Sequence, residues 1–211
     1  MGLLKIKICG MREPENIKDV CALNPDYLGF IFYPKSKRFV TDKEAKLLNG
    51  TVPEQVNKVG VFVNELLPEI VKKINLFGLD LVQLHGDEPV EYCSELKSID
   101  VKVIKSFGID IHFDFKKLEA YSGCCDYFLF DTKSTDWGGT GKKFDWQVLS
   151  GYTLSKPVFL SGGIGPDDAQ EIKHLSGFNL HALDLNSKFE IKPALKDAEL
   201  IEKFLQEIRK K

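Results

Sequence analysis

The sequence contains no hydrophobic run long enough to cross a membrane. Its longest apolar stretch runs only from Tyr27 to Tyr33, whereas a spanning helix needs about 20 apolar residues. The first residues carry no apolar segment of signal-peptide length, and Ile6 stands where a myristoylation signal requires serine or threonine. We therefore expect a cytoplasmic protein with no membrane partner.

The sequence also lacks an excess of charge of either sign. Its 29 lysines and arginines against 31 aspartates and glutamates give a formal net charge of -2. Nucleic acid is therefore not an expected partner, and a small anionic substrate must be bound by a local group of residues. The 211 residues, 43% of them hydrophobic, suffice for one domain or two small ones. No linker or low-complexity tract divides the chain, so we expect a single domain over residues 1–211.

Cysteines at metal-binding spacing are absent too. The five cysteines are scattered along the chain, odd in number, and include no Cys-x-x-Cys pair. No metal site and no disulfide framework are therefore expected. Most of these thiols should serve as small apolar core residues. They are Cys9, Cys21, Cys93, Cys124 and Cys125.

What the sequence does contain is a series of short, nearly continuous apolar runs. Their starts lie about 22 to 30 residues apart, the length of one strand–helix unit. Continuous rather than alternating apolar residues are typical of strands buried on both faces of a parallel sheet. The expected strands are Lys5–Cys9, Tyr27–Phe32, Lys58–Val63, Leu79–His85, Val101–Ser106, Tyr127–Asp131, Pro157–Ser161 and Ala182–Asn186.

Helical patterns fill the gaps between these runs. Helices are expected at Pro14–Ala22, after Thr41, at Glu65–Phe77, after Asp87, at Phe113–Tyr121, at Phe144–Leu149, after Pro166 and at Lys196–Lys211. Eight strands alternating with helices predict an α/β fold of the (β/α)₈ TIM-barrel type. The alternative is an open doubly wound sheet, which more often has a G-x-G-x-x-G turn after its first strand. Here that turn reads Cys9-Gly10-Met11-Arg12.

Candidate functional residues follow the strands, because the working residues of such a barrel lie at the carboxyl ends of its strands. We expect the first and sixth strands to contribute the chemistry and the other strands to bind a substrate. The candidates in chain order are Cys9, Arg38, Gln83, His85, Asp131, Gly162, Gly163, Asp184, Asn186 and Ser187.

Cys9 and Asp131 are the candidate base and acid. A thiolate stabilised by nearby positive charge accepts a proton, and a carboxyl kept protonated by burial donates one. Taken singly, each residue has another interpretation. Cys9 would be a buried apolar thiol, and Asp131 would be a carboxylate bound to backbone amides.

Gly162 and Gly163 predict a phosphate site. Glycines let backbone amides approach an anion closely, and a helix after Pro166 would add its amino-terminal dipole. Asn186 and Ser187 would donate further hydrogen bonds. The alternative is that the two glycines only form a tight turn.

Three further features have two interpretations each. Arg38 suits a bidentate contact to a substrate carboxylate, but also a solvated loop. His85 either lines the pocket or is hydrogen-bonded at the end of its strand. The glycine-rich segment Asp136–Trp146 fails as a Walker A loop, because Asp136 stands at the first glycine position. We interpret it as a lid beside the pocket, with a plain connecting loop as the alternative.

Seven motifs occur in order along nearly the whole chain. They are Lys7–Met11, Gly29–Arg38, Val59–Asn64, Val82–Glu88, Phe130–Thr132, Gly138–Trp146 and Leu160–Gly163. Together they resemble the phosphoribosylanthranilate isomerase family of tryptophan biosynthesis. The resemblance implies a barrel enzyme that uses no metal or organic cofactor. It also implies an Amadori rearrangement of N-(5-phosphoribosyl)anthranilate to 1-(2-carboxyphenylamino)-1-deoxyribulose 5-phosphate.

The same resemblance implies roles for individual residues. It makes Cys9 the general base and Asp131 the general acid. Arg38 would face the anthranilate carboxylate, and Gly163 with Ser187 would face the phosphate. A monomer and a homodimer both remain open.

One position departs from the family pattern. After the eighth strand this chain has Lys188 where the family usually has glycine. Lysine disfavours a positive φ, so we expect ordinary backbone there. Its ammonium either points into solvent or replaces a lost contact to the phosphate. Two other functions stay open: another phosphosugar isomerase, epimerase or synthase on the same barrel, and a non-catalytic phosphosugar-binding protein.

Overall fold

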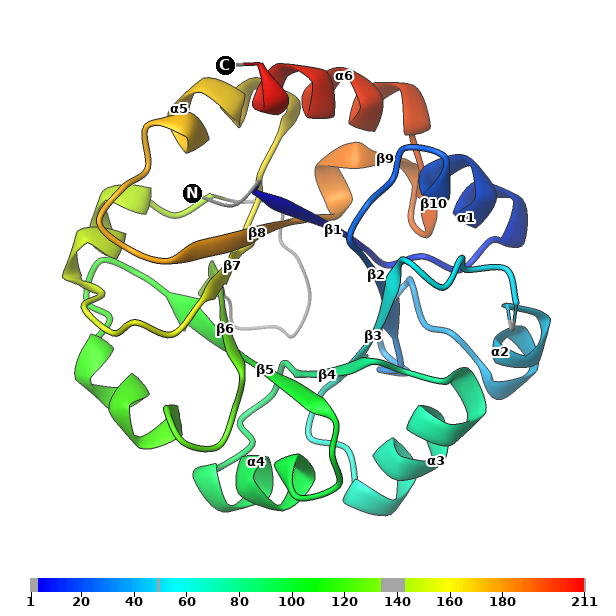
Figure 1. Cartoon of the computed structure of the whole chain (residues 1–211), viewed down its shortest axis with the longest axis horizontal. Coiled ribbons are helices and arrows are strands. Elements are labelled where there is room, and N and C mark those ends of the chain that lie inside the picture. Colours follow the sequence, from blue (N-terminus) through cyan, green and yellow to red (C-terminus); the bar gives the residue numbers. More distant parts are fainter. Residues whose placement is uncertain (1–3, 49, 134–142, 211) are drawn as a thin grey trace.

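Eight parallel strands pair in chain order and close into a barrel, because β8 pairs with β1 as well as with β7. The computed structural model describes residues 4–48, 50–133 and 143–210. Figure 1 looks down the barrel and shows the ring of strands with the helices outside it. The predicted (β/α)₈ fold is confirmed. The strands are β1 Lys5–Cys9, β2 Tyr27–Ile31, β3 Asn57–Phe62, β4 Leu81–Leu84, β5 Lys102–Ile109, β6 Tyr127–Thr132, β7 Val158–Leu160 and β8 Leu180–Leu185.

The helical segments begin at the predicted start signals. Thr41 caps α2 in a reciprocal box, since its hydroxyl accepts a bond from the Glu44 N–H and its own N–H donates to the Glu44 carboxylate. Pro14 opens α1, and a proline lies in the first turn of α3. The α-helices are α1 Pro14–Cys21, α2 Asp42–Leu48, α3 Leu67–Phe77, α4 Val90–Lys97, α5 Ala169–Lys173 and α6 Ala198–Arg209.

Several predicted helices differ from the structure. The segments expected at 113–121 and 144–149 are 3₁₀ helices, Phe115–Tyr121 and Trp146–Gly151. The helix expected from Lys196 begins instead at Ala198. Lys196 belongs to an antiparallel hairpin of β9 Glu190–Lys192 and β10 Leu195–Lys196 that was not predicted.

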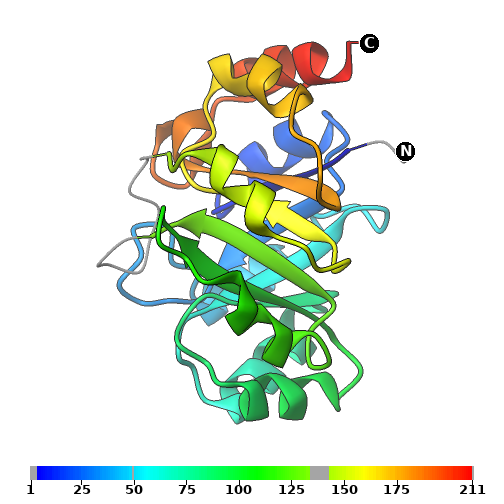
Figure 2. The same ribbon diagram turned by 90° about the vertical axis from the view of Figure 1, so that its left-hand side faces the viewer.

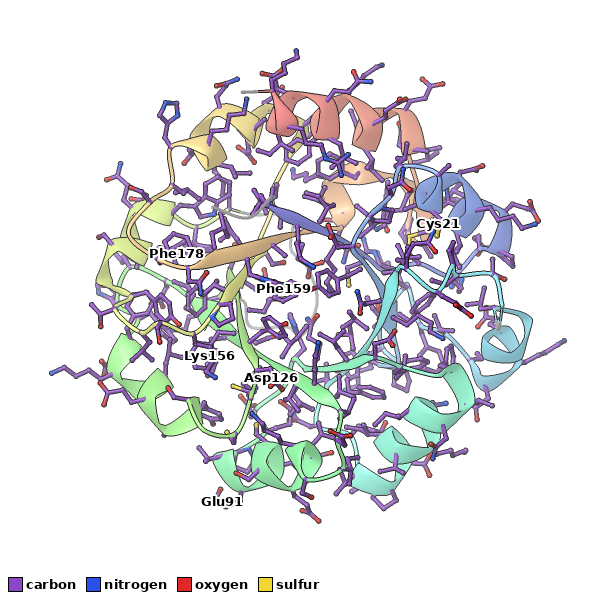
Figure 3. The ribbon with its side chains drawn as sticks, viewed as in Figure 1. Cys21, Glu91, Asp126, Lys156, Phe159 and Phe178 are labelled. Atoms are coloured by element: carbon purple, nitrogen blue, oxygen red, sulfur yellow. The ribbon has the colours of Figure 1, made fainter. Side chains whose placement is uncertain are left out.

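Apolar side chains fill the amino-terminal part of the barrel interior. The rings of Tyr27 and Phe159 meet edge to face with centroids 5.2 Å apart. Figure 3 shows Phe159 near the middle of the ring, whereas Glu91 lies at the periphery. The barrel is therefore a packed core and not a pore. The layer comprises Tyr27, Val59, Leu81, Ile104, Leu129, Phe159 and Ala182.

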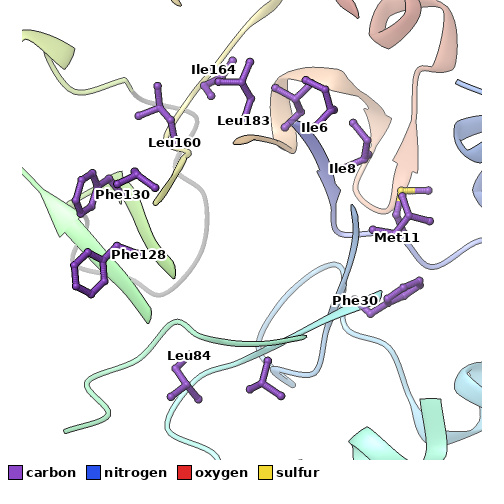
Figure 4. Close-up of a cluster of buried hydrophobic side chains, with 14 of the residues drawn as sticks. Ile6, Ile8, Met11, Phe30, Leu84, Phe128, Phe130, Leu160, Ile164 and Leu183 are labelled. Carbon is purple, nitrogen blue, oxygen red and sulfur yellow. The ribbon is translucent and has the colours of Figure 1, made fainter. Parts of the chain in front are cut away.

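The opposite face of the strands packs against the helices. Ile6 and Ile8 of β1, and Phe128 and Phe130 of β6, belong to this larger core. Figure 4 shows these side chains pointing away from the barrel axis. Because successive residues of a strand face opposite ways, Lys7 between Ile6 and Ile8 must face inward.

The direction of the strands places the functional end of the barrel. Figure 2 shows that β1 begins and α6 ends on the same side of the molecule. Since all eight strands are parallel, their carboxyl ends lie together at the other end. Among the described residues, no helix has the length and apolar character needed to span a membrane.

Candidate active site

On five neighbouring strands, the inward side chain two residues beyond the apolar layer is polar. Leu129, for example, is followed on the same face by Asp131, and Ala182 by Asp184. A polar layer therefore covers the apolar plug at the carboxyl end of the barrel. Its members, in or directly after β4 to β8, are Gln83, Ser106, Asp131, Ser161 and Asp184.

Above this layer lies a pocket at the carboxyl ends of the strands. All ten residues selected from the sequence line it. Sequence reasoning missed the apolar wall of the pocket, which consists of Ile31, Tyr33, Val61, Val63 and Ile164. The first four of these residues lie in or directly after the apolar runs that predicted the strands. The full lining is Cys9, Ile31, Tyr33, Ser36, Arg38, Val61, Val63, Gln83, His85, Asp131, Ser161, Gly162, Gly163, Ile164, Asp184, Asn186 and Ser187.

Cys9 is the last residue of β1, with 4% of its surface exposed. Gly29 lies opposite it in the register with β2, and a Cβ at Gly29 would lie 2.7 Å from Cys9 Sγ. Glycine there leaves room for the thiol. Burial raises the pKa of Cys9, while the positive charges of Lys7 and Lys196 oppose this. The net direction is upward, against the lowered pKa that a preformed thiolate would need.

Lys7 and Asp184 form an ion pair inside the barrel. Lys7 Nζ lies 2.8 Å from Asp184 Oδ2, and the two side chains are 0% and 4% exposed. The positive charge of Lys7 also acts on Cys9, whose pKa it lowers. Burial raises the pKa of Asp184, and the charge of Lys7 acts to lower it. Asp184 Oδ1 is buried without a hydrogen-bond partner in the described part of the chain. Lys7 had no predicted role.

Asp131 is held by a chain of polar contacts. Its Oδ2 lies 3.4 Å from His85 Nε2, and its Oδ1 accepts the Thr132 N–H at 2.7 Å. His85 Nδ1 lies 2.9 Å from Gln83 Nε2 and 3.0 Å from Ser106 Oγ. These contacts fix the imidazole and present one carboxyl oxygen of Asp131 to it.

The predicted phosphate cradle has the required backbone but a weaker helix than expected. Gly162 and Gly163 have φ of 88° and 72°, values that favour glycine. A Cβ at Gly162 would lie 2.6 Å from the Thr132 backbone nitrogen. The segment after Pro166 is a 3₁₀ turn, Pro166–Asp168, followed by the short α5. A helix dipole therefore does not favour the phosphate as predicted. The backbone amides of the two glycines remain as the candidate phosphate ligands.

Arg38 lines the pocket but is paired within the chain. Its Nη2 lies 2.5 Å and its Nε 2.9 Å from the carboxylate of Glu190. Lys196 Nζ lies 2.6 Å from the same carboxylate. Glu190 and Lys196 come from the β9–β10 hairpin, and sequence reasoning missed both. The nearest signal was the departure from the family pattern at Lys188, two residues before Glu190.

Two further predictions concern the rim. Lys188 is exposed and is not among the described residues with positive φ, so its predicted ordinary backbone is confirmed. Most of the glycine-rich segment 136–146 lies outside the described residues, and the lid interpretation with it. In the described ranges, no cluster of three or more histidine, cysteine or acidic side chains has metal-binding geometry.

Comparison with known sequences gives consistent matches over nearly the whole chain. The sequence profile of the N-(5'phosphoribosyl)anthranilate (PRA) isomerase family matches residues 6–207. The N-(5'-phosphoribosyl)anthranilate isomerase of Parabacteroides distasonis is 46% identical over 209 residues, which cover 96% of this chain and 92% of the relative.

Solved structures agree in fold. The phosphoribosyl anthranilate isomerase of Thermus thermophilus superimposes with a TM-score of 0.87 at 27% identity, covering 97% and 98% of the two chains. A phosphoribosyl anthranilate isomerase in complex with reduced 1-(o-carboxyphenylamino)-1-deoxyribulose 5-phosphate gives 0.83 at 29% identity, covering 98% and 99%. Monomers generated from the dimeric enzyme of Thermotoga maritima give 0.79 at 29% identity, with the same coverage.

Proposed function

The chain belongs to the N-(5'-phosphoribosyl)anthranilate isomerase family, an enzyme family of tryptophan biosynthesis, and on that premise we propose that Cys9 is its general base and Asp131 its general acid. The reaction is the isomerisation of N-(5-phosphoribosyl)anthranilate to the corresponding 1-deoxyribulose 5-phosphate. The observation that carries the residue assignment is that a thiol and a carboxyl from β1 and β6 line one pocket. Strands one and six are far apart around the ring, so the two groups can flank a sugar.

The acid step opens the ribose ring. Asp131 donates a proton to the ring oxygen, the C1–O bond breaks, and the nitrogen lone pair forms an iminium at C1. The donated proton must start on Asp131, and Oδ2 is the oxygen beside His85 Nε2. His85, itself held by Gln83 and Ser106, orients the carboxyl for this transfer.

The base step follows on the opened sugar. Cys9 removes the proton from C2, and the electron pair of that bond forms the enolamine. Tautomerisation then places a proton on C1 and removes one from the C2 hydroxyl. Both enzyme groups return to their starting state if Cys9 gives back its proton and Asp131 recovers one. Because burial raises the pKa of the Cys9 thiol, the positive charges of Lys7 and Lys196 are needed to make the thiolate accessible.

Binding of the substrate would use different groups of the pocket for its phosphate and its carboxylate. The backbone amides at Gly162 and Gly163, with Asn186 and Ser187, suit the phosphate. Arg38, which lines the same pocket, suits the anthranilate carboxylate. We further expect Gln83, His85 and Asp184 to contact the sugar, where Asp184 Oδ1 lacks a partner within the described residues. A monomer and a homodimer both remain predictions for the assembly, and cytoplasmic location remains a prediction too.

A turnover assay with N-(5-phosphoribosyl)anthranilate tests the proposal. Cys9→Ala should lower kcat by at least about 10²-fold, as expected for a lost general base, and leave KM within a small factor. Asp131→Asn should be similarly damaging, because the amide keeps the shape but carries no acidic proton. Cys21→Ala, at a thiol outside the pocket, is the control and should retain full activity.

The outcomes separate the possible functions. A folded Cys9→Ala or Asp131→Asn variant with near-normal turnover would remove that residue from the mechanism. A parent protein that binds the substrate without converting it would be a phosphosugar-binding protein. A parent that converts only other phosphosugars would be a different isomerase on the same barrel.

A further inference from the structure

The β9–β10 hairpin brings a buried carboxylate to the edge of the active site. The Glu190 side chain is 4% exposed. It accepts hydrogen bonds from Arg38 Nε at 2.9 Å, Arg38 Nη2 at 2.5 Å, Lys196 Nζ at 2.6 Å and the Ala194 N–H at 3.2 Å. Two cations and one backbone amide thus converge on a single carboxylate.

The hairpin itself is fixed from both sides. The Asn16 side chain on α1 bonds both the N–H and the carbonyl of Lys196, at 2.7 and 2.9 Å. Lys196 Nζ also reaches Asn186 Oδ1 at 2.8 Å, a residue that lines the pocket. Ala194 keeps a φ of 68°, which is unusual for alanine, in the turn whose N–H bonds Glu190. The Glu190 carboxylate therefore has little freedom to move.

This carboxylate determines how the Arg38 guanidinium is presented. Glu190 occupies the Nε edge of the planar group, and Nη1 makes no hydrogen bond to any residue that the structure describes. The Nη1–Nη2 edge is then free to bind a second carboxylate in the bidentate manner. The stem is also confined, because a Cβ at Gly10 would lie 2.5 Å from Arg38 Cδ. Gly10 directly follows Cys9, so Arg38 is held against the backbone beside the reacting thiol.

We propose that Glu190, supported by Lys196, is a positioning residue that presents one edge of Arg38 to the anthranilate carboxylate and so sets the preference for a carboxylated substrate. The inference rests on the proposed function, because it requires Arg38 to be the partner of that carboxylate. Arg38 contacts the substrate, whereas Glu190 acts only through it. Ordering the guanidinium before binding avoids much of the conformational entropy that a free arginine loses when it binds an anion.

A pair of substrates that differ in one group tests the proposal. N-(5-phosphoribosyl)anthranilate and N-(5-phosphoribosyl)aniline are identical except for the carboxylate. The ratio of their kcat/KM values measures the carboxylate preference for the parent, Glu190→Gln, Arg38→Met and the double variant. The control is Glu199→Gln, which removes an exposed carboxylate on α6.

We expect Glu190→Gln to reduce the preference by about 10-fold or more, equal to about 1.4 kcal/mol, mainly through KM of the carboxylated substrate. Turnover of the aniline substrate shows that the variant is folded, and any slowing that is common to both substrates cancels in the ratio. Arg38→Met should lose the preference, and adding Glu190→Gln should cost no more, because both changes remove one interaction. If Glu190→Gln does not fold, Glu190→Asp keeps the charge, shortens its reach and should lower the preference.

Each other outcome identifies what fails. If the parent converts neither substrate, the proposed function itself is wrong. If the parent is active and Arg38→Met loses the preference while the Glu190 variants keep it, Glu190 does not position Arg38. If both substrates slow equally in the Glu190 variants, Glu190 is only a structural support, and the inference is overturned.

Discussion

The two ends of the barrel interior are built from the same strands but do different work. At the amino end, Leu129 and Phe159 belong to a layer that is apolar throughout. Two residues further along the same strands, Asp131 and Ser161 line the pocket. The first layer gains free energy from burial of apolar area, at about 25 cal/mol per Å². The second layer buries charges, which stabilise only while each is paired.

The comparison shows that residues which stabilise the fold and residues which line the active site lie next to each other on one face of each strand. A change in the apolar layer should affect folding, and a change in the polar layer should affect chemistry. Lys7 lies on the boundary between the two layers, because it is a buried partner of Asp184 and its charge also lowers the pKa of Cys9. A substitution of Lys7 should therefore affect both folding and chemistry.

Lys7→Met is expected to have the largest effect of these substitutions, because it should lower both stability and activity. Removing one partner leaves Asp184 buried and unpaired, which costs about 3–5 kcal/mol of unfolding free energy. The charge that opposes the raised pKa of Cys9 is lost as well, so the rising limb of kcat/KM should move to higher pH. Urea unfolding and a pH–rate profile measure the two effects.

The matched control is Lys5→Met, on the same strand face but 42% exposed at its side chain. It should change stability by no more than about 0.5 kcal/mol and leave the pH profile in place. An unshifted profile in a folded Lys7→Met protein would mean that Lys7 does not assist Cys9.

Leu129→Ala should lower stability and leave the chemistry nearly unchanged. Truncating a fully buried leucine leaves a cavity and costs about 2–5 kcal/mol. The pocket lies one pleat away, so kcat/KM of the folded protein should stay within a few-fold of the parent. Thermal unfolding and steady-state kinetics below the transition check this. A large kinetic loss at full folding would show that the apolar layer also positions Asp131.

The third prediction concerns Lys196 and pH. Burial lowers the pKa of Lys196 to about 8 from 10.5, although Glu190 opposes this. Between those pH values the unfolded chain binds the proton that the folded chain has released. This contribution to the unfolding free energy therefore increases with pH, by up to about 1.4 kcal/mol per unit.

Lys196→Met lacks this proton, so the stability of the parent relative to the variant should rise from pH 8 to pH 10. Urea unfolding of both proteins at several pH values measures the difference, in which the contributions of titrating groups distant from Lys196 cancel. Lys192→Met, at an exposed lysine of the same hairpin, is the control. A difference independent of pH would contradict the prediction.

Lys188→Ala should have the smallest effect. The side chain is exposed on the rim, and surface substitutions usually change stability by no more than about 0.5 kcal/mol. KM should stay within about 2-fold of the parent if the ammonium is solvated, since even exposed ion pairs contribute only about 0.2–1 kcal/mol. A 10-fold rise in KM at low salt, shrinking as salt is added, would instead assign Lys188 to the phosphate.

Much of this molecule could be predicted because its signals are local. The apolar run Lys5–Cys9 matches β1 residue for residue, and parallel strands buried on both faces need such runs. The rule that function lies at strand ends then selected residues that line one pocket, without any information on distance. Cys9 and Asp131 are 122 positions apart in the chain, yet the rule places both at one end of the barrel.

What could not be predicted depends on contacts between distant parts of the chain. The β9–β10 hairpin has strands of three and two residues, too short to show any periodicity. The partner of Arg38 lies in that hairpin, so the arginine was interpreted without Glu190. The raised pKa of Cys9 likewise arises mainly from burial in the folded barrel, which no local pattern reveals.

The ion pair between Lys7 and Asp184 also has a consequence during synthesis of the chain. The two residues are 177 positions apart, so at about 5–20 residues per second the second leaves the ribosome roughly 10 to 35 s after the first. Until then β1 has no β8 beside it, and an ammonium without its counterion is excluded from an apolar interior. The Lys7 side chain of β1 therefore stays in contact with water until β8 is made. Closure of the barrel, by pairing of β1 with β8, is the last step. A nascent chain that stalls before β8 exposes an unpaired strand edge together with an unpaired charge, and this is the form that chaperones and proteases meet.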